Sequence, residues 1–385
     1  MDITSVRQEL PAVENLIHLN HAGVSPMSRR CAEAVKAHTD DVLHNGTRHS
    51  AQWRPGVERS RQRLARLMGA DPAEIAFTKN TTHGIIIAAN SIPWRDGDNV
   101  IITDLEFPAN VYPWLSLEWR GVEARIVQHR DGRILVDDVR EAIDAHTRAV
   151  AVSWVEFSNG FRNNVHALGE LCRERGAYFV VDAIQGLGAL QMRVADAPID
   201  FLAGAAHKWL LGPTGFGYLY CRTAILDELV PAMVGWRSVV DADEYLDYKL
   251  EQRPDAGRFE EGGCNYASAL GLGEAVGLLL EVGPTEIERR VLRLTDVLIE
   301  ELLRAGFEIR SSRASGERSA IVSAGHPRVA PEVVVAALVR ENMIAVVRDG
   351  AVRLSPHFYN TEDEMHQVVA VMRATCSAGA RAAAS

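Results

Sequence analysis

The chain has 385 residues, of which 47% are hydrophobic and 24% are charged. This length gives a prior of about two to three domains and is ample for a large buried core, so disorder and low-complexity structure are excluded for the chain as a whole. Acidic residues outnumber basic ones by 51 to 41, whereas proteins that bind nucleic acid over a broad surface are basic. We therefore expect no nucleic-acid partner, while a local basic pocket for a small anion is compatible with this balance.

The cysteines and the apolar runs indicate the cellular compartment in which we expect the protein. Five cysteines are an odd number, and none of them form a CxxC pair. Disulfide frameworks and zinc ribbons are poor interpretations of this spacing, and a reducing cytoplasm fits it better. The first residues lack the apolar stretch of a signal peptide, and no apolar run has the length of a membrane span. We therefore expect a cytoplasmic protein with no membrane partner.

The predicted elements of the first 221 residues alternate between helix and strand. Helical spacing of apolar residues predicts helices over 29–42, 57–68 and 165–175, and a further helix that opens at residue 81. Short apolar runs predict strands over 74–78, 99–103, 148–153, 177–182, 201–205 and 217–221. Apolar strands that alternate with amphipathic helices indicate βαβ units around a mostly parallel, buried sheet.

The pattern changes near residue 267. It is mostly helical over 270–303, with a break at 283–284, and short strands then surround a helix over 332–341. We predict an α/β domain over residues 15–270 and a smaller α+β domain over residues 271–385 that also takes in residues 1–14. The alanine-rich tail, residues 376–385, is expected to fray.

Polar side chains follow several of the predicted strands. Asp182 ends one strand, Gln185 comes three residues later, and Lys208 follows the next strand. Thr81 and Thr82 follow the strand over 74–78 and open a helix, where free N–H groups and two hydroxyls would suit a phosphate. Ligands of open α/β sheets bind at the carboxyl ends of the strands, so we expect these residues to share one site.

Pyridoxal phosphate is a cofactor that would use all of these groups. It needs a lysine for a Schiff base, a carboxylate for the ring nitrogen, a flat side chain over the ring and donors around the phosphate. Phe107, after the strand over 99–103, could supply the flat side chain. A lysine among apolar residues near a cationic ring would have a lowered pKa, so its neutral amine could attack a carbonyl.

Four segments together resemble a known family. They read VVDAIQ at 180–185, AHKWLLGPTG at 206–215, FTKNTT at 77–82 and VRLSPHFYN at 352–360. Taken together, and in the order in which they follow one another along the chain, these segments are similar to class V aminotransferases. Class V aminotransferases are fold type I pyridoxal phosphate enzymes. That group includes cysteine desulfurases, kynureninases and isopenicillin N epimerase-like proteins. The resemblance runs from residue 18 to about residue 372, and it implies a large, mostly parallel sheet domain with a smaller α+β C-terminal domain.

The resemblance also implies a role for each matching residue. Lys208 corresponds to the Schiff-base lysine and Asp182 to the partner of the ring nitrogen. Gln185 corresponds to the side chain that bonds the ring hydroxyl, and Phe107 to the side chain that stacks on the ring. The phosphate would be held by Thr81, Thr82 and Trp236, and His207 corresponds to the cofactor-binding histidine that precedes the lysine.

Further matches concern the substrate and the partner subunit. Arg353 matches the arginine that grips the substrate carboxylate, a task that suits its planar fork. Asn20 and His21 lie in HLNHAG at 18–23, the segment where the resemblance begins, and are expected to contact substrate as well. Gly263 lies in segment 258–265, which matches the segment that family members lend across a dimer interface to complete the cofactor site. A homodimer acting on an amino-acid-like small molecule is therefore expected.

Three departures from the family pattern bear on the reaction. Desulfurases carry a cysteine on a loop before the carboxylate arginine, whereas residues 346–353 contain none. Two phosphate donors of the family, a serine and a threonine, are replaced by Ala205 and Gly263. At the place of a ring-contacting asparagine the chain has Phe157.

These departures favour transamination, or carbon–sulfur cleavage without a persulfide, over desulfuration. Epimerisation is a further alternative, and a non-catalytic binding protein that kept the fold is an alternative of another class. No metal site is expected, because the spacings of His18, His21 and His83 match no standard metal pattern.

Overall fold

The structure is a computed structural model that describes residues 3–382. Its centre is a seven-stranded sheet in the order β2-β8-β7-β6-β5-β3-β4. Strand β8 runs antiparallel to both of its neighbours, and the other strands pair in parallel. The strands are β2 (Ile75–Thr78), β3 (Asn99–Thr103), β4 (Glu123–Val127), β5 (Thr147–Ser153), β6 (Tyr178–Asp182), β7 (Phe201–Ala205) and β8 (Gly217–Cys221).

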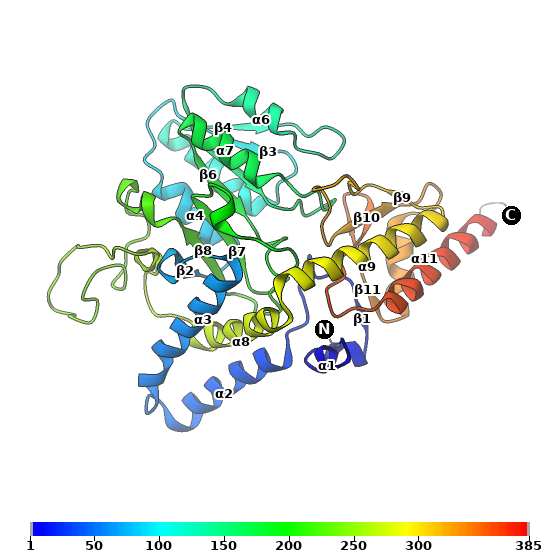
Figure 1. Cartoon of the computed structure of the whole chain (residues 1–385), viewed down its shortest axis with the longest axis horizontal. Helices are drawn as coiled ribbons and strands as arrows, with labels where there is room; N and C mark the ends of the chain where they lie inside the picture. Colours follow the sequence, from blue (N-terminus) through cyan, green and yellow to red (C-terminus); the bar gives the residue numbers. More distant parts are fainter. Residues whose placement is uncertain (1–2, 383–385) are drawn as a thin grey trace.

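Helices cover both faces of this sheet (Figure 1). Alternate residues of one strand belong to different cores: Ile101 of β3 packs on one face, whereas Val100 and Ile102 pack on the other. Burial on both faces explains why these strands are almost wholly apolar. The first core includes residues of α3 (Trp53–Met68), α7 (Val165–Arg175) and α8 (Tyr266–Val282), and the second includes residues of α4 (Thr81–Ser91) and α5 (Tyr112–Leu115).

The seven-stranded sheet and the helices on its two faces form the large part of the molecule, and its remaining elements lie around them. Helix α2 (Arg29–Asn45) contacts α8, α6 (Val136–Ala142) contacts α7, and a long segment without regular strands joins β8 to α8. That segment projects from the left of Figure 1. Helix α7 ends at Gly176, whose φ of 68° is in the left-handed region that glycine tolerates.

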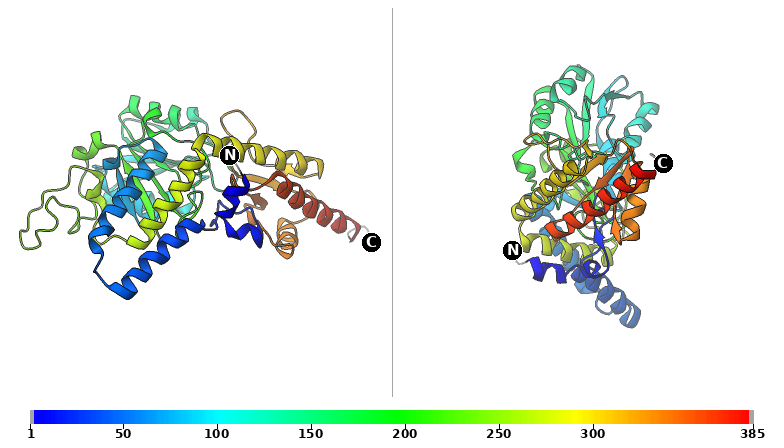
Figure 2. Two further views of the ribbon diagram at one scale, coloured as in Figure 1. Left: turned by 60° about the horizontal axis from the view of Figure 1, so that its bottom comes forward. Right: turned by 90° about the vertical axis from the view of Figure 1, so that its right-hand side faces the viewer.

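A second, smaller part is built from the C-terminal third of the chain. Its sheet has the order β12-β13-β10-β9, and Figure 2 shows its helices from two further sides. Helix α1 (Ile3–Gln8) and strand β1 (Ile17–His18) come from the N-terminus, and β1 pairs with β11 (Met343–Ile344). The other elements are α9 (Pro284–Arg304), β9 (Glu308–Ile309), β10 (Val322–Gly325), α10 (Pro331–Arg340), β12 (Val346–Arg348), β13 (Ala351–Leu354) and α11 (Glu362–Ala382).

The predicted domain boundary between residues 270 and 271 falls inside a helix. Helix α8 runs unbroken from Tyr266 to Val282 and packs on α2 and α3 of the large part, whereas α9 packs on α11 of the small part. The chain bends by 79° at Gly283, which caps both helices with a φ of 91°, whereas Ile287 and Val291 of α9 still pack in the core of the large part. We therefore propose Gly283 as the junction of the two parts.

The C-terminal tail differs from expectation over most of its length. Helix α11 continues through Ala382, and Cys376 is buried in the core of the small part. The prediction that residues 376–385 fray is therefore wrong at Cys376, which packs on that core, and the backbone is helical through Ala382; residues 383–385 lie outside the described part.

Across residues 3–382 no single helix is long and apolar enough for a membrane span. The bent pair α8 and α9, at 79° to each other, passes such a test by length and composition only.

Candidate active site

A cavity of about 310 Å³ opens at the carboxyl ends of the central strands. The N-terminal segment closes one side of it: the Gln185 Nε2 donates a hydrogen bond to the Ala22 carbonyl over 3.0 Å, and the Ser25 N–H donates to the His207 carbonyl over 2.8 Å. Eight of the residues singled out from the sequence line this cavity: Thr81, Thr82, Phe107, Asp182, Gln185, His207, Lys208 and Arg353.

Asp182 and Lys208 form the ionic centre of the cavity. Asp182 is the last residue of β6 and pairs with Ala203 of β7, the strand that leads to Lys208. The Asp182 carboxylate is 2% exposed and accepts a hydrogen bond from the Ile184 N–H over 2.9 Å. Burial raises the pKa of Asp182 to about 6. A carboxylate that stays ionised at neutral pH in so dry a place is suited to pair with a cationic ring nitrogen.

Burial has the opposite effect on Lys208. Loss of hydration lowers the pKa of Lys208 to about 8, the nearby Asp182 charge opposes this shift, and the positive charges of Arg353 and Arg348 reinforce it. A substantial fraction of the amine is therefore neutral near physiological pH, as a nucleophile or general base requires.

One end of the cavity has the features of a phosphate site. Thr81 and Thr82 are the first residues of α4, whose N-terminal N–H groups and dipole attract anions. Within residues 3–382, neither the Thr81 Oγ1 nor the His207 Nδ1 has a hydrogen-bond partner, although both are buried. Buried polar atoms without partners are rare in folded proteins, so both atoms are suited to bind an acceptor-rich ligand. Burial lowers the pKa of His207 to about 4, so its imidazole is neutral.

Two aromatic rings form a wall of the cavity. The Phe107 and Phe157 rings meet edge to face, with centroids 5.3 Å apart. The Lys208 Nζ lies 5.8 Å from the Phe107 centroid. Phe107 therefore offers a flat surface next to the amine, where the sequence predicted the side chain that stacks on the ring.

Gln185 is held in place by its own amide. Besides the bond from Nε2 to Ala22, its Oε1 accepts a hydrogen bond from the Trp209 Nε1 over 3.1 Å. Among the residues that the structure describes, Nε2 makes only the one hydrogen bond to Ala22, so its second N–H can donate to a ligand, as the resemblance implies.

Arg353 enters the cavity from β13 of the small part. Its Nη1 donates a hydrogen bond to the Phe157 carbonyl over 2.6 Å, and its Nη2 donates to the Asn20 Oδ1 over 3.2 Å. The Nε has no partner among the described residues although it is buried. Burial lowers the pKa of Arg353 to about 10, so it stays charged at neutral pH. The free N–H groups of this fixed fork can receive a carboxylate.

Four predicted residues do not line the cavity of their own chain: Asn20, His21, Trp236 and Gly263. Asn20 contacts a lining residue, because its Oδ1 accepts a hydrogen bond from the Arg353 Nη2. His21 is fully buried, with Nδ1 2.7 Å from the Ser355 carbonyl and Nε2 2.7 Å from the Tyr359 hydroxyl. Burial holds the pKa of His21 well below its usual value, so both nitrogens serve the packing of the small part and leave no contact for substrate. Trp236 is 47% exposed on the segment between β8 and α8, and Gly263 lines a separate pocket beside Lys79.

The sequence interpretation missed two charged residues of this region. Arg348 lines the cavity. Glu106 lies behind Phe107, where the Ser153 N–H and Oγ donate to its two carboxylate oxygens over 2.6 Å each. Burial raises the pKa of Glu106 to about 7. For Glu106, the only signal in the sequence was its position next to Phe107. The sequence pattern gave no signal for Arg348, because its place at the cavity depends on the turn between β12 and β13.

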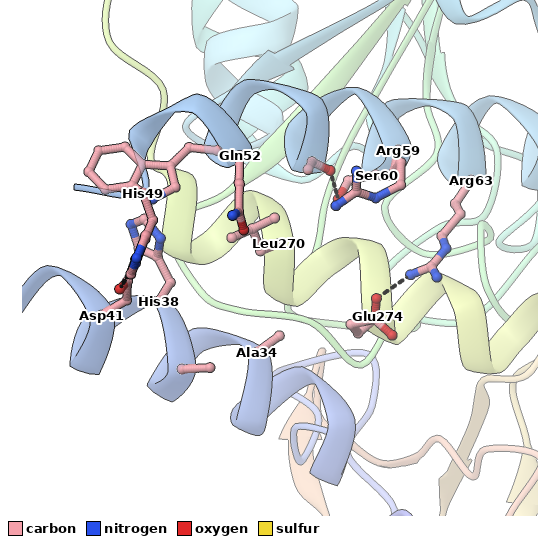
Figure 3. Close-up of a pocket in the computed structure, with 13 residues that line it drawn as sticks. Ala34, His38, Asp41, His49, Gln52, Arg59, Ser60, Arg63, Leu270 and Glu274 are labelled. Carbon is pink, nitrogen blue, oxygen red and sulfur yellow. Dashed lines mark hydrogen bonds and ion pairs between the residues drawn. The ribbon is translucent and has the colours of Figure 1, made fainter. Parts of the chain in front are cut away.

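A second pocket, between α2, α3 and α8, has a different character (Figure 3). The His49 Nδ1 lies 2.7 Å from the Asp41 carboxylate, and Arg63 forms an ion pair with Glu274. None of the residues singled out from the sequence line this pocket. Its charges largely neutralise one another, so it is a weaker candidate for catalysis. Among residues 3–382 no group of three or more histidine, cysteine, aspartate or glutamate side chains is placed to hold a metal ion.

Comparison with known proteins identifies the family. The model of the aminotransferase class-V family matches residues 17–374. A protein named probable cysteine desulfurase from Methanothermobacter thermautotrophicus is 30% identical, with 95% of this chain and 96% of that protein covered. The apo structure of a cysteine desulfurase from Thermococcus onnurineus NA1 superposes with a TM-score of 0.86 at 28% identity, covering 96% of this chain and 97% of that one.

The chain therefore belongs to the aminotransferase class-V family. Its relatives carry different names: an uncharacterized aminotransferase of Bacillus subtilis is 25% identical over 94% of this chain and 95% of that protein. The fold is the fold type I architecture of pyridoxal phosphate enzymes, and the chain is a pyridoxal phosphate-dependent enzyme of transferase or lyase type.

Proposed function

We propose that the enzyme transfers the amino group of an amino acid, with Lys208 moving the proton of the α-carbon and with no cysteine acting as a nucleophile. The observation that carries this proposal is the composition of the cavity. Lys208, Asp182 and Arg353 line it, but within residues 3–382 no cysteine does.

The residues of the chain divide the work between cofactor and substrate. Bound pyridoxal phosphate supplies an aldehyde that condenses with amino groups and a ring that accepts negative charge from the α-carbon. Asp182 would hold a proton on the ring nitrogen, Phe107 would fix the plane of the ring, and Thr81, Thr82 and His207 would hold the phosphate. Arg353 would orient the substrate carboxylate, so that the α-proton faces the amine of Lys208.

The five thiols support a route without a persulfide. Cys31, Cys172, Cys221 and Cys376 are buried, and Cys264 lines the pocket that also holds Gly263. Burial raises the pKa of Cys264 to about 12, so it is a thiol rather than a thiolate at neutral pH. Furthermore, β12 and β13 are joined by only two residues, Asp349 and Gly350, where a desulfurase would carry its reactive loop.

Carbon–sulfur cleavage and epimerisation are the alternatives. The names of the relatives favour the first, since two similar proteins are named cysteine desulfurase or probable cysteine desulfurase. Elimination at the β-carbon needs the same base and the same carboxylate clamp, and it needs no cysteine. Transamination and its two alternatives all begin with removal of the α-proton. They differ in the step that follows, and our proposal of transamination is a proposal about that step.

We further propose a cytoplasmic homodimer. The segment between β8 and α8 exposes a group of large apolar side chains, and such patches mark interaction surfaces. The residues are Trp236, Tyr245, Leu246, Tyr248 and Leu250, with exposures from 47% to 89%. Gly263, at the end of this segment, would then lie near the phosphate of the second subunit.

The test is a screen of amino acids against the purified holoenzyme. Each amino acid is mixed with the enzyme and a 2-oxo acid, and products are identified by mass spectrometry. A new amino acid formed from the 2-oxo acid supports transamination. Sulfide and pyruvate from cysteine, without amino transfer, would replace it by carbon–sulfur lyase activity, and a change of configuration alone would replace it by epimerase activity.

A further inference from the structure

Arg348 and Arg353 share one face of a tight hairpin. Val346 of β12 lies opposite Arg353 of β13, and Arg348 lies opposite Ala351. Residues opposite each other point to the same face, as do residues two apart on one strand, so Arg348 and Arg353 point to the same side. Diagonal neighbours of this kind are about 7–8 Å apart, and their Cβ atoms are somewhat closer than that.

The turn of the hairpin fixes this arrangement. Asp349 and Gly350 have φ angles of 48° and 63°, and positive φ at both central residues defines the type I′ turn that closes two-residue hairpins. Register in a hairpin is set by its turn, so Arg348 cannot move along β12 without breaking the pairing. Both guanidinium groups therefore border the same cavity.

The charge of Arg348 has no acidic partner. Within residues 3–382 it forms no ion pair, and its Nη1 donates a hydrogen bond only to the adjacent Val347 carbonyl over 3.0 Å. Its positive charge nevertheless reaches two residues of the cavity, because it lowers the pKa of Lys208 and of Arg353. Lys208, Arg348 and Arg353 are thus three cations in a lining whose single acid is Asp182.

We infer that the substrate is an α-amino acid, or the corresponding 2-oxo acid, that carries a second acidic group on a short side chain. This inference rests on the proposed function. Arg353 would bind the α-carboxylate and Arg348 the distal carboxylate or sulfinate, across the spacing of one diagonal pair. Arg348 is then a specificity-determining residue, and the apolar wall of Phe107 and Phe157 faces the remainder of the side chain.

The test compares acids that differ only in the second charge. Isothermal titration of the holoenzyme with succinate and with propionate measures binding without turnover, and kinetics with L-aspartate, L-glutamate and L-alanine measure KM. We expect succinate to bind more tightly than propionate. In Arg348→Gln the Kd for succinate and the KM for aspartate or glutamate should rise about 10- to 100-fold, as loss of a hydrogen bond between charged groups predicts, while the KM for alanine should change far less.

Two further variants test whether the effect depends on the positive charge at position 348 and is specific to that position. Arg348→Lys keeps the charge and should recover part of the binding of succinate. Arg340→Gln removes an exposed arginine of α10 in the same part of the molecule and should change nothing.

Equal losses for alanine and aspartate in Arg348→Gln would overturn the inference, since both arginines would then grip one carboxylate. Equal binding of succinate and propionate would overturn it as well. If succinate is preferred in an Arg348-dependent way but no amino group is transferred, the proposed function fails and the specificity inference stands.

Discussion

The guanidinium of Arg353 donates a hydrogen bond from Nη1 to the backbone carbonyl of Phe157 over 2.6 Å. Arg353 belongs to the small part and Phe157 follows a strand of the large sheet, so the cavity forms only where the two parts meet. The same contact fixes the guanidinium before substrate arrives, which lowers the entropy that binding costs.

Replacing Arg353 by lysine should therefore impair the binding of substrate and leave cofactor binding intact. An ammonium cannot bond Phe157, Asn20 and a carboxylate with one planar fork. We expect the KM for the best amino acid to rise about 100-fold, with cofactor affinity within about twofold of wild type. An unchanged KM would contradict the role of Arg353 as the carboxylate clamp.

Lys208→Ala should lose the covalent attachment of the cofactor while the fold is retained. In wild type, borohydride should fix the cofactor to the peptide that contains Lys208, which mass spectrometry detects. The variant should give no such adduct and an unchanged circular dichroism spectrum. An adduct on another lysine in the variant would refute the assignment.

Asp182→Asn should leave the free energy of unfolding at least as high as in wild type while it lowers the catalytic rate. At pH 7 the pH is above the folded pKa of about 6, so the cost of burying the carboxylate is fully present, and the neutral amide avoids it. A shift of about 2 units corresponds to at most about 3 kcal/mol, and the lost attraction to Lys208 reduces the gain.

We therefore expect the apo variant to be at least as stable as wild type at pH 7 in urea unfolding. Its advantage should shrink as the pH falls below about 6, where the wild-type carboxyl protonates. The kcat of the holoenzyme should fall by at least 100-fold, because an amide cannot hold a proton on the ring nitrogen. A fully active variant would contradict the role given to Asp182.

The uptake of cofactor by the apoenzyme should depend on the pKa of Lys208. The neutral amine attacks the aldehyde, so the rate should rise about tenfold per pH unit below a pH of about 8 and level off above it. Arg348→Gln removes a charge that lowers this pKa and should move the inflection to higher pH. Asp182→Asn removes a charge that raises it and should move the inflection to lower pH, so shifts in the same direction would contradict the electrostatic account.

Cys264→Ala tests the route without a persulfide. We expect little sulfide from cysteine under reducing conditions, and the same amount from wild type and variant. Cys31→Ala, at a buried thiol outside the pocket that Cys264 lines, is the matched control. Robust sulfide release that disappears only in Cys264→Ala would contradict this route, because the Cys264 thiol would then be the nucleophile.

Residues at the ends of the strands were predictable because their position follows from the strand pattern. Asp182, Gln185 and Lys208 lie close to the ends of apolar strands, and parallel strands bring their carboxyl ends to one edge. The helix that starts at Thr81 was predictable for the same reason. By contrast, β4 was not predicted: its burial alternates imperfectly along an edge of the sheet, which gives a weak signal.

Contacts between the two parts of the molecule were not predictable in this way. The bond between Asn20 and Arg353 joins residues 333 positions apart, and no local pattern carries that information. His21 illustrates the opposite failure. Its place in a matching segment predicted a contact with substrate, but the packing of Ser355 and Tyr359 around its ring takes both nitrogens.

The two-residue turn at Asp349 and Gly350 also bears on how such an enzyme could change its chemistry. The tip of this hairpin is the place where the peptide can lengthen without disturbing either sheet, because loop insertions at exposed turns cost little free energy. A few inserted residues with a cysteine among them would bring a thiol to the mouth of the cavity while Lys208, Asp182 and Arg353 keep their places. If the proposed function holds, a change from amino-group transfer to a thiol-dependent reaction would begin with an insertion at this one turn, with Lys208, Asp182 and Arg353 unchanged.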